Sequence, residues 1–150
     1  MVDLTPSQEN YLKTVYIKAS QNGYAKMSDI ADLLRVKKSS VNGALNILTD
    51  KGLINYVPYS QITLTVAGLA KAEEIMKKFD VMIGFFSNIL KLSKEEASAN
   101  SCRIEHVMSE ELFNKMSKFC KFMGGFFADN PDCRKQLDDF LSPPHQHKNK

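Results

Sequence analysis

Long apolar stretches are missing from this sequence of 150 residues. No window reaches the roughly 18 uninterrupted apolar residues that a membrane-spanning helix requires. The opening segment, MVDLTPSQEN, also lacks the basic stretch followed by an apolar stretch that defines a signal peptide. We therefore expect the protein to stay in the cytoplasm and to have no membrane partner.

Cysteine is scarce and occurs in an odd number, as Cys102, Cys120 and Cys133. The wide spacing and the odd number argue against the disulfide framework of a small secreted protein and favour reduced thiols. These side chains are therefore available as core residues or as metal ligands.

Recognisable catalytic motifs are absent as well. The chain has no glycine-rich phosphate loop, no nucleophile elbow and no H-E-x-x-H segment, and its three histidines leave little for a catalytic triad. Cys102 and His106 could form a nucleophile and base, but their spacing on one helix supplies no oxyanion site and no orienting group. We predict that the protein is not an enzyme.

The charge is nearly balanced, with a formal net value of +3. Such a small excess does not identify a nucleic-acid binder by itself, so the local clustering of basic residues decides. A cluster does occur, at Arg35, Lys37 and Lys38. A content of 43% hydrophobic and 25% charged residues fits one compact globular unit, or two small units that share a core.

The first helix is marked at its start by capping residues. Thr5 is the expected N-cap, Pro6 occupies the first helical position, where its missing N–H costs nothing, and Gln8 completes a capping box. Apolar residues then recur at helical spacing until Gly23, which ends the helix.

Two further helices and a hairpin are expected next. Apolar residues at helical spacing predict helices over residues 27–34 and 38–51. The β-type runs 53–57 and 62–64 are separated by residues 58–61, which predicts a short hairpin. Helix, helix, turn, helix and hairpin in this order indicate a winged helix-turn-helix.

The helix at residues 38–51 is the expected recognition helix. Its side chains off the apolar stripe are small or amide-bearing, which suits contact with base edges in the major groove, and the basic residues at its start suit phosphate contact. The predicted DNA-binding residues are Arg35, Lys37, Lys38, Ser39, Ser40, Asn42, Gly43 and Asn46, together with Tyr59 in the hairpin turn.

Two alternatives stand beside this interpretation. Structurally, the same pattern could be two ordinary packed helices joined by a solvated basic turn. Functionally, a winged helix could serve as a protein-interaction module that no longer reads DNA, which Gly43 on the recognition helix and the modest net charge would favour.

The rest of the chain is predicted to be helical. A long helix from Thr65 to about Lys91 joins the two halves, and Ser93 and Ser109 are the expected N-caps of the next two helices. A weaker helix follows Asn130. The expected fold is mainly α, with a winged helix-turn-helix DNA-binding domain followed by an all-helical dimerisation domain.

We expect a domain boundary between residues 1–72, which bind DNA, and residues 73–150, which dimerise. The second half carries more aromatic surface than so small a monomer readily buries, and self-association is the natural use of the excess. The aromatic and apolar residues in question are Phe85, Phe86, Leu90, Phe113, Phe119, Phe122, Phe126 and Phe127. The terminal His145 and His147 could add metal donors, but a short terminus that contains histidine is more often inert.

A possible metal site lies in the second half. Cys102, Glu105 and His106 stand at positions i, i+3 and i+4, which places a thiolate, a carboxylate and an imidazole on one helical face. The alternative without a metal is a buried cysteine beside an exposed Glu-His pair.

The chain resembles the diphtheria toxin repressor and manganese transport regulator family. The resemblance is carried by SDIADLLRVKKSSVNGALNILTDKGLINY followed by PYSQITLTVAG, by the opening LTPSQENYLKTVY and by the later SCRIEHVMSEEL. It implies a homodimeric transcriptional regulator that binds a palindromic operator when Mn(II) or Fe(II) is bound. It also implies that Cys102, Glu105 and His106 match the family's ligand cluster on that helix.

At its other ligand positions the chain departs from the family pattern. The resemblance aligns Asn10 and Lys13 with ligands of the first helix, and Phe79, Ile83 and Ser98 with ligands of the second half. An ammonium repels a cation and a phenyl ring offers no donor, so we expect metal binding to be weakened or absent.

The sequence is compatible with two interpretations of the metal site. In one, the three remaining donors recruit Mn, Fe or Zn with unusual partners such as Glu9, Asp80 or Asn10. In the other, the protein is metal-independent, and Lys13 acts as an internal counter-charge to Glu105.

Overall fold

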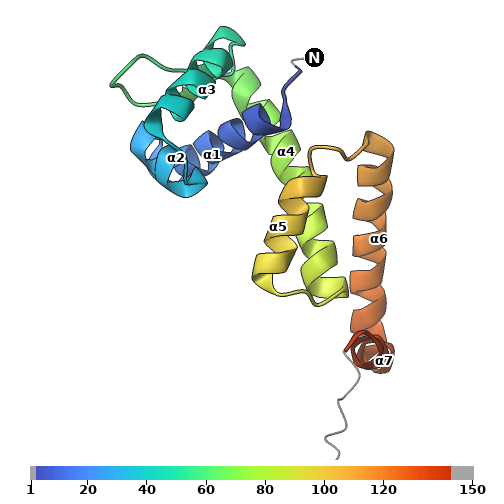
Figure 1. Cartoon of the computed structure of the whole chain (residues 1–150). Helices are drawn as coiled ribbons and strands as arrows, with labels where there is room; N and C mark the ends of the chain where they lie inside the picture. Colours follow the sequence, from blue (N-terminus) through green and yellow to red (C-terminus); the bar gives the residue numbers. More distant parts are fainter. Residues whose placement is uncertain (1–2, 143–150) are drawn as a thin grey trace, which may run out of the picture. The chain divides into compact units, whose positions relative to one another are not determined.

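The computed structural model describes residues 3–142, and the chain divides into two compact units between Lys77 and Lys78. The expected His145 and His147 tail lies outside the described residues. The first unit contains α1 (Pro6–Asn22), α2 (Met27–Leu34), α3 (Lys38–Asp50), β1 (Ile54–Asn55), β2 (Thr63–Leu64) and the beginning of α4 (Val66–Gly84). Figure 1 shows α1, α2 and α3 clustered in this unit.

The start of α1 has the capping box that the sequence predicts. The Thr5 hydroxyl accepts from the Gln8 amide at 3.3 Å, and the Gln8 side chain accepts from the Thr5 amide at 3.1 Å. Gly23 ends the helix in the left-handed region, with φ of 79°. Both ends of α1 are therefore fixed by local sequence.

One apolar core holds the first unit together. Its fully or almost fully buried members come from α1, α2, α3, β1, α4 and the segments beside them: Leu12, Val15, Ala25, Ile30, Ala31, Val41, Leu45, Leu48, Leu53, Ile54, Tyr56, Ile62, Ala72 and Ile75. Because α3 contributes the stripe Val41, Leu45 and Leu48 to this core, its opposite face is turned to solvent.

The hairpin is shorter than the sequence predicts. β1 and β2 pair in an antiparallel register, Ile54 with Leu64 and Asn55 with Thr63. The ladder stops there because a turn already begins at Val57, whose carbonyl accepts from the Ser60 amide at 3.0 Å. Ile62 forms a bridge with Ala25 instead, so it ties the hairpin to the segment before α2.

Gly68 lets α4 pass close to Leu53, the residue that precedes β1. A Cβ at this position would lie 1.7 Å from the backbone oxygen of Leu53, so no side chain fits. The Thr65 hydroxyl accepts from the Gly68 amide at 3.0 Å, and the Thr65 amide donates to the Leu53 oxygen at 3.0 Å. The start of α4 is thereby fixed to the hairpin.

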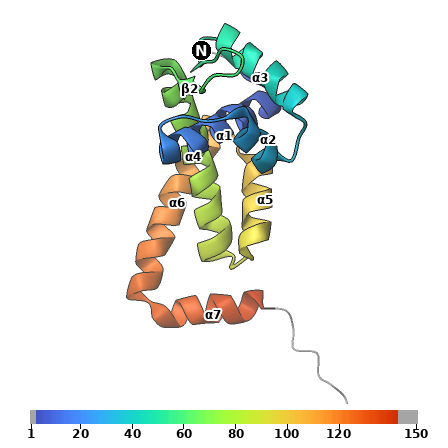
Figure 2. The same cartoon turned by 90° about the vertical axis from the view of Figure 1, so that its left-hand side faces the viewer.

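The second unit contains the end of α4 and four further helical segments. These are the π-helix η1 (Phe85–Ile89), α5 (Lys94–Ile104), α6 (Glu110–Asp129) and α7 (Pro131–Leu141). Ser93 and Ser109 cap α5 and α6 as the sequence predicts, through bonds from the amides of Glu96 and Leu112. Figure 2 shows that the chain turns sharply at the end of α6, so that α7 runs away from it in a different direction.

The helix predicted from Thr65 to about Lys91 changes its winding. It is an α-helix only to Gly84 and then becomes the π-helix η1, after which Lys91 adopts the left-handed region with φ of 57°. α5 ends at Ile104 and is followed by a turn, in which the amide of Val107 donates to the Ile104 carbonyl at 3.0 Å.

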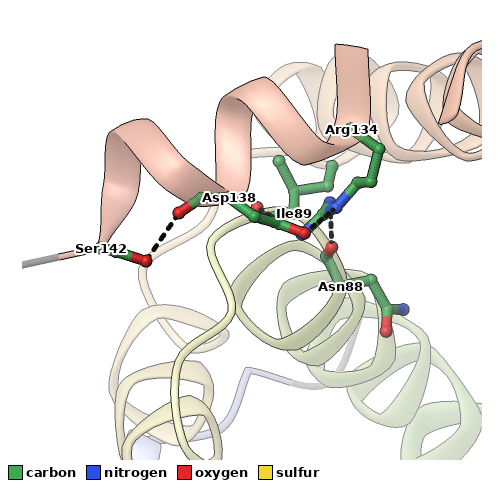
Figure 3. A network of polar contacts seen from close by, with 5 residues as sticks. All are labelled: Asn88, Ile89, Arg134, Asp138 and Ser142. Atoms are coloured by element: carbon green, nitrogen blue, oxygen red, sulfur yellow. Dashed lines mark hydrogen bonds and ion pairs between the residues drawn. The ribbon is translucent and has the colours of Figure 1, made fainter. Parts of the chain in front are cut away.

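Arg134 fastens α7 to the end of η1. Its guanidinium donates to the backbone oxygen of Asn88 at 2.5 Å and pairs with Asp138 one turn away in α7 (Figure 3). The same group lies 4.9 Å from the centroid of the Phe127 ring. Because Arg134 binds carbonyls at a helix end, it supplies partners that the helix itself lacks there.

Candidate nucleic-acid interface and metal centre

The turn between α2 and α3 is tight and is held by backbone hydrogen bonds. Arg35 ends α2 in the left-handed region with φ of 54°, and the amide of Val36 donates to the Ala31 carbonyl at 3.1 Å. The start of α3 is therefore fixed relative to α2, in the manner of a helix-turn-helix motif.

The basic residues predicted to contact phosphates lie at the start of α3. Arg35, Lys37 and Lys38 are all exposed. Lys37 is the N-cap of α3, and no side chain caps this helix end. A helix N-terminus with free amides and flanking cations attracts anions such as phosphates.

The predicted base-reading residues lie on the outward face of α3. Ser39, Ser40, Gly43 and Asn46 are exposed, opposite the buried stripe. Asn42 differs, because it is half-buried and its Oδ1 accepts a hydrogen bond of 2.9 Å from the hydroxyl of Tyr56. Four of these residues are therefore exposed to solvent, and the fifth is hydrogen-bonded to Tyr56, the residue that follows β1.

The hairpin turn provides the wing. Tyr59 is fully exposed and adopts a positive φ of 68°, so its ring projects from the turn. The turn is fixed by Ser60, whose hydroxyl donates to the Val57 oxygen at 2.7 Å.

A cavity of about 660 Å³ lies between the wing and the helix-turn-helix. Its lining joins the starts of α2 and α3 to the wing: Lys26, Met27, Ser28, Lys38, Ser39, Asn42, Tyr56, Pro58, Tyr59, Ser60 and Gln61. Lys26 is a further basic residue of this surface, outside the predicted cluster of Arg35, Lys37 and Lys38. Its signal was its position at the start of α2, where it is the N-cap.

The second unit brings three potential metal ligands together. The ligand atoms of Cys102, Glu105 and His106 all lie within 4.8 Å of one another. Glu105 is buried, Cys102 and His106 are half-buried, and the Glu105 Oε1 lies 3.4 Å from the His106 Nε2. Such separations allow three donors to reach one ion, so this donor set fits a divalent metal.

The helix that carries these donors ends within the cluster. α5 stops at Ile104, with Glu105 as its C-cap and His106 beyond it. The three donors nevertheless converge, because Glu105 keeps helical backbone angles and its amide donates to the Ser101 carbonyl. The sequence predicted all three donors within one helix, but only Cys102 lies in α5, while Glu105 and His106 follow its end.

The remaining ligand positions of the resemblance hold poor donors. In the second unit, Phe79 and Ile83 are half-buried and Ser98 is exposed. Asp80, considered as a substitute ligand, is exposed, and partial desolvation raises the pKa of its carboxyl. The second unit therefore offers a compact group of three donors rather than a full set.

In the first unit, Lys13 of α1 is buried, with 8% of its surface exposed, while Glu9 and Asn10 are half-buried. A buried ammonium is costly unless an anion compensates it. Lys13 is therefore not an ordinary surface lysine.

α6 and α7 expose a large apolar surface. Neither helix contains a buried residue. The exposed large side chains on the two helices are Leu112, Phe119, Phe122, Phe126, Phe140 and Leu141. An apolar surface of this extent on so small a unit is typical of an interface.

Among residues 3–142, no helix is long and apolar enough to cross a membrane.

Two family sequence models match the chain. Residues 3–62 match the iron dependent repressor N-terminal DNA binding domain, and residues 65–138 match the iron dependent repressor metal binding and dimerisation domain. An uncharacterized HTH-type transcriptional regulator of Methanocaldococcus jannaschii is 32% identical over 117 residues, which are 77% of this chain and 94% of the relative.

Other relatives agree with these matches. The HTH-type transcriptional regulator MntR of Lysinibacillus sphaericus is 28% identical over 134 residues, covering 89% of this chain and 93% of MntR. The crystal structure of T. acidophilum IdeR superposes with a TM-score of 0.68 at 25% identity, covering 79% of this chain. The structure of the manganese regulator SloR gives 0.69 at 23% identity, also covering 79% of this chain. This chain spans only 55% of the length of each of these two solved chains.

Proposed function

The chain belongs to the iron-dependent repressor family, and we propose that it binds a palindromic DNA operator as a homodimer under weakened metal control. The family consists of DNA-binding transcriptional regulators and not of enzymes, so the predictions of family, mainly α fold and non-enzymatic function are confirmed. We assign DNA binding to residues 1–72, and dimerisation and metal binding to residues 73–150.

The outward face of α3 is the observation that carries the proposal. Exposed Ser39, Ser40 and Asn46 offer hydrogen-bonding groups to base edges, while exposed Lys37 and Lys38 offer charge to phosphates beside the helix start. Phosphate contacts position the protein and base contacts supply specificity. We assign Arg35, Gly43 and Tyr59 to the same surface.

Dimerisation would use the apolar surface of α6 and α7. Phe122 and Phe126 stack with their ring centroids 6.1 Å apart, and 67% of Phe122 and 38% of Phe126 are exposed. A second copy of the chain would remove this surface from water. Twofold symmetry would then present two recognition helices, which matches a palindromic operator.

Cys102, Glu105 and His106 are the residues that would hold a divalent metal. A bound ion would link these donors and so stabilise the part of the second unit that contains them. A thiolate and an imidazole favour Zn(II) over Mn(II) or Fe(II) at such a site. The metal is thus expected to be a divalent transition metal.

Metal control is weakened because the other ligand positions lack donors. Phe79 and Ile83 are apolar, and the resemblance aligns Lys13 with a ligand carboxylate of manganese sensors. An ion held by three protein donors loses the binding free energy that further donors contribute. We therefore propose that DNA binding persists without metal.

A gel shift on DNA from upstream of the protein's own gene tests the proposal. We expect a retarded complex whose affinity falls as the salt concentration rises, because phosphate contacts release counterions. A random duplex of equal length should bind more weakly at every salt concentration. Equal affinity for both DNAs, or no complex at low salt, would contradict operator binding.

A further inference from the structure

Within residues 3–142, Asn42 is the one predicted base-reading residue whose side chain is hydrogen-bonded to another side chain. Tyr56 directly follows β1, and its ring is buried in the core of the first unit, with 8% exposure. Its hydroxyl reaches out of the core and donates to the Asn42 Oδ1 at 2.9 Å. The Tyr56 hydroxyl therefore holds the Oδ1 end of Asn42 before any DNA is present.

The orientation matters because an amide has two different ends. A bidentate contact with adenine requires that Oδ1 accept from N6 while Nδ2 donates to N7. In this protein the Tyr56 hydroxyl engages Oδ1, whereas Nδ2 makes no hydrogen bond to any residue between 3 and 142. Nδ2 therefore keeps both of its hydrogens for a base, whereas Oδ1 keeps only one lone pair.

We infer that Tyr56 is a positioning residue that makes Asn42 a hydrogen-bond donor toward DNA and selects bases with acceptor edges. In the major groove these are guanine, through O6 and N7, and thymine, through O4. Adenine presents a single acceptor, N7, beside its N6 donor. We expect it to be the weaker partner, because a bidentate contact with it needs Oδ1 to accept from N6 as well as from Tyr56. The inference rests on the proposed function, since it concerns how the recognition helix reads its operator.

The surroundings leave a base edge room to approach. Asn42 and Tyr56 both line the cavity of about 660 Å³ between α3 and the wing, and Asn42 is only half-buried. The hydroxyl is not needed to bury the ring, since phenylalanine would pack in the same place. Removing the hydroxyl should therefore change how Asn42 recognises DNA without unfolding the protein.

Selection from a randomised duplex library tests the inference with four proteins. These are the wild type, Asn42→Ala, Tyr56→Phe and the matched control Tyr16→Phe. Tyr16 is a half-buried residue of α1, and its replacement removes the same hydroxyl oxygen as Tyr56→Phe. The position read by Asn42 is the one whose preference Asn42→Ala abolishes. Circular dichroism and thermal melting establish that each variant is folded.

At that position the wild type and Tyr16→Phe should select guanine or thymine. Tyr56→Phe releases Oδ1, so the affinity ratio of adenine to the preferred base should rise about tenfold, while overall affinity changes less. A wild-type preference for adenine, or selective binding with the same profile in Tyr56→Phe, would overturn this inference alone. Absence of selective DNA binding by the wild type would overturn the proposed function together with it.

Discussion

Replacing Lys37 and Lys38 by alanine should flatten the salt dependence of DNA binding by a calculable amount. Both lysines are exposed at the uncapped start of α3. Each phosphate that a lysine neutralises contributes about 0.9 to the slope of log affinity against log salt concentration. A dimer loses four such contacts, so the slope should fall by about 3.6.

This change in slope corresponds to a large difference in measured affinity. Between about 50 and 200 mM salt, a fourfold change, the wild type should lose roughly 150-fold more affinity than the double variant. Fluorescence anisotropy with a labelled duplex at four or five salt concentrations measures both slopes. The affinity for unrelated DNA should fall in parallel, because phosphate contacts carry no base information.

A matched double variant separates local contact from overall charge. Lys94→Ala with Lys135→Ala removes the same charge from exposed positions in the second unit. Its slope should stay close to that of the wild type. If both double variants lower the slope equally, the lysines act through the net charge of the protein, and the assignment of phosphate contacts to the start of α3 is wrong.

Three further changes test the fold, the dimer and the metal site. Gly68→Ala should destabilise the protein by roughly 3 kcal/mol, because its Cβ would meet the Leu53 oxygen at 1.7 Å, whereas Gly124→Ala, with open space around it, should be neutral or stabilising in thermal melting. Phe122→Asp should shift the sedimentation equilibrium from dimer toward monomer, because it places a charge in an apolar surface, and an unchanged dimer would rule out that surface. Lys13→Glu should tighten Mn(II) binding in calorimetry, because it replaces an ammonium that repels the metal ion with a carboxylate that attracts it. An unchanged affinity would show that residue 13 does not act on the ion.

Local sequence was sufficient to predict the helix starts. The side chains of Thr5, Ser93 and Ser109 accept hydrogen bonds from amides within three residues, so the relevant partners are visible in the sequence itself. The start of α3 and the buried stripe behind it were predictable for a similar reason, since helical periodicity separates its two faces.

Contacts between distant residues could not be predicted in this way. Ile62, predicted to begin the second strand, bridges to Ala25 instead, and Asn42 is hydrogen-bonded to Tyr56, fourteen positions away. The change to a π-helix at Phe85 likewise has no periodic signal in the sequence. The resemblance to the repressor family, rather than their spacing alone, identified Cys102, Glu105 and His106 as candidate metal ligands.

Measuring DNA binding with and without metal decides whether this protein recognises its operator without a bound ion. Wild-type protein is titrated with operator DNA in the presence of a strong chelator, and again after saturation with Mn(II) or Zn(II), while calorimetry records the binding of each ion. We predict selective binding in chelator, a change of less than about tenfold on adding metal, and weaker binding of Mn(II) than of Zn(II). Tight stoichiometric Mn(II) binding, with DNA binding abolished by the chelator, would contradict the account.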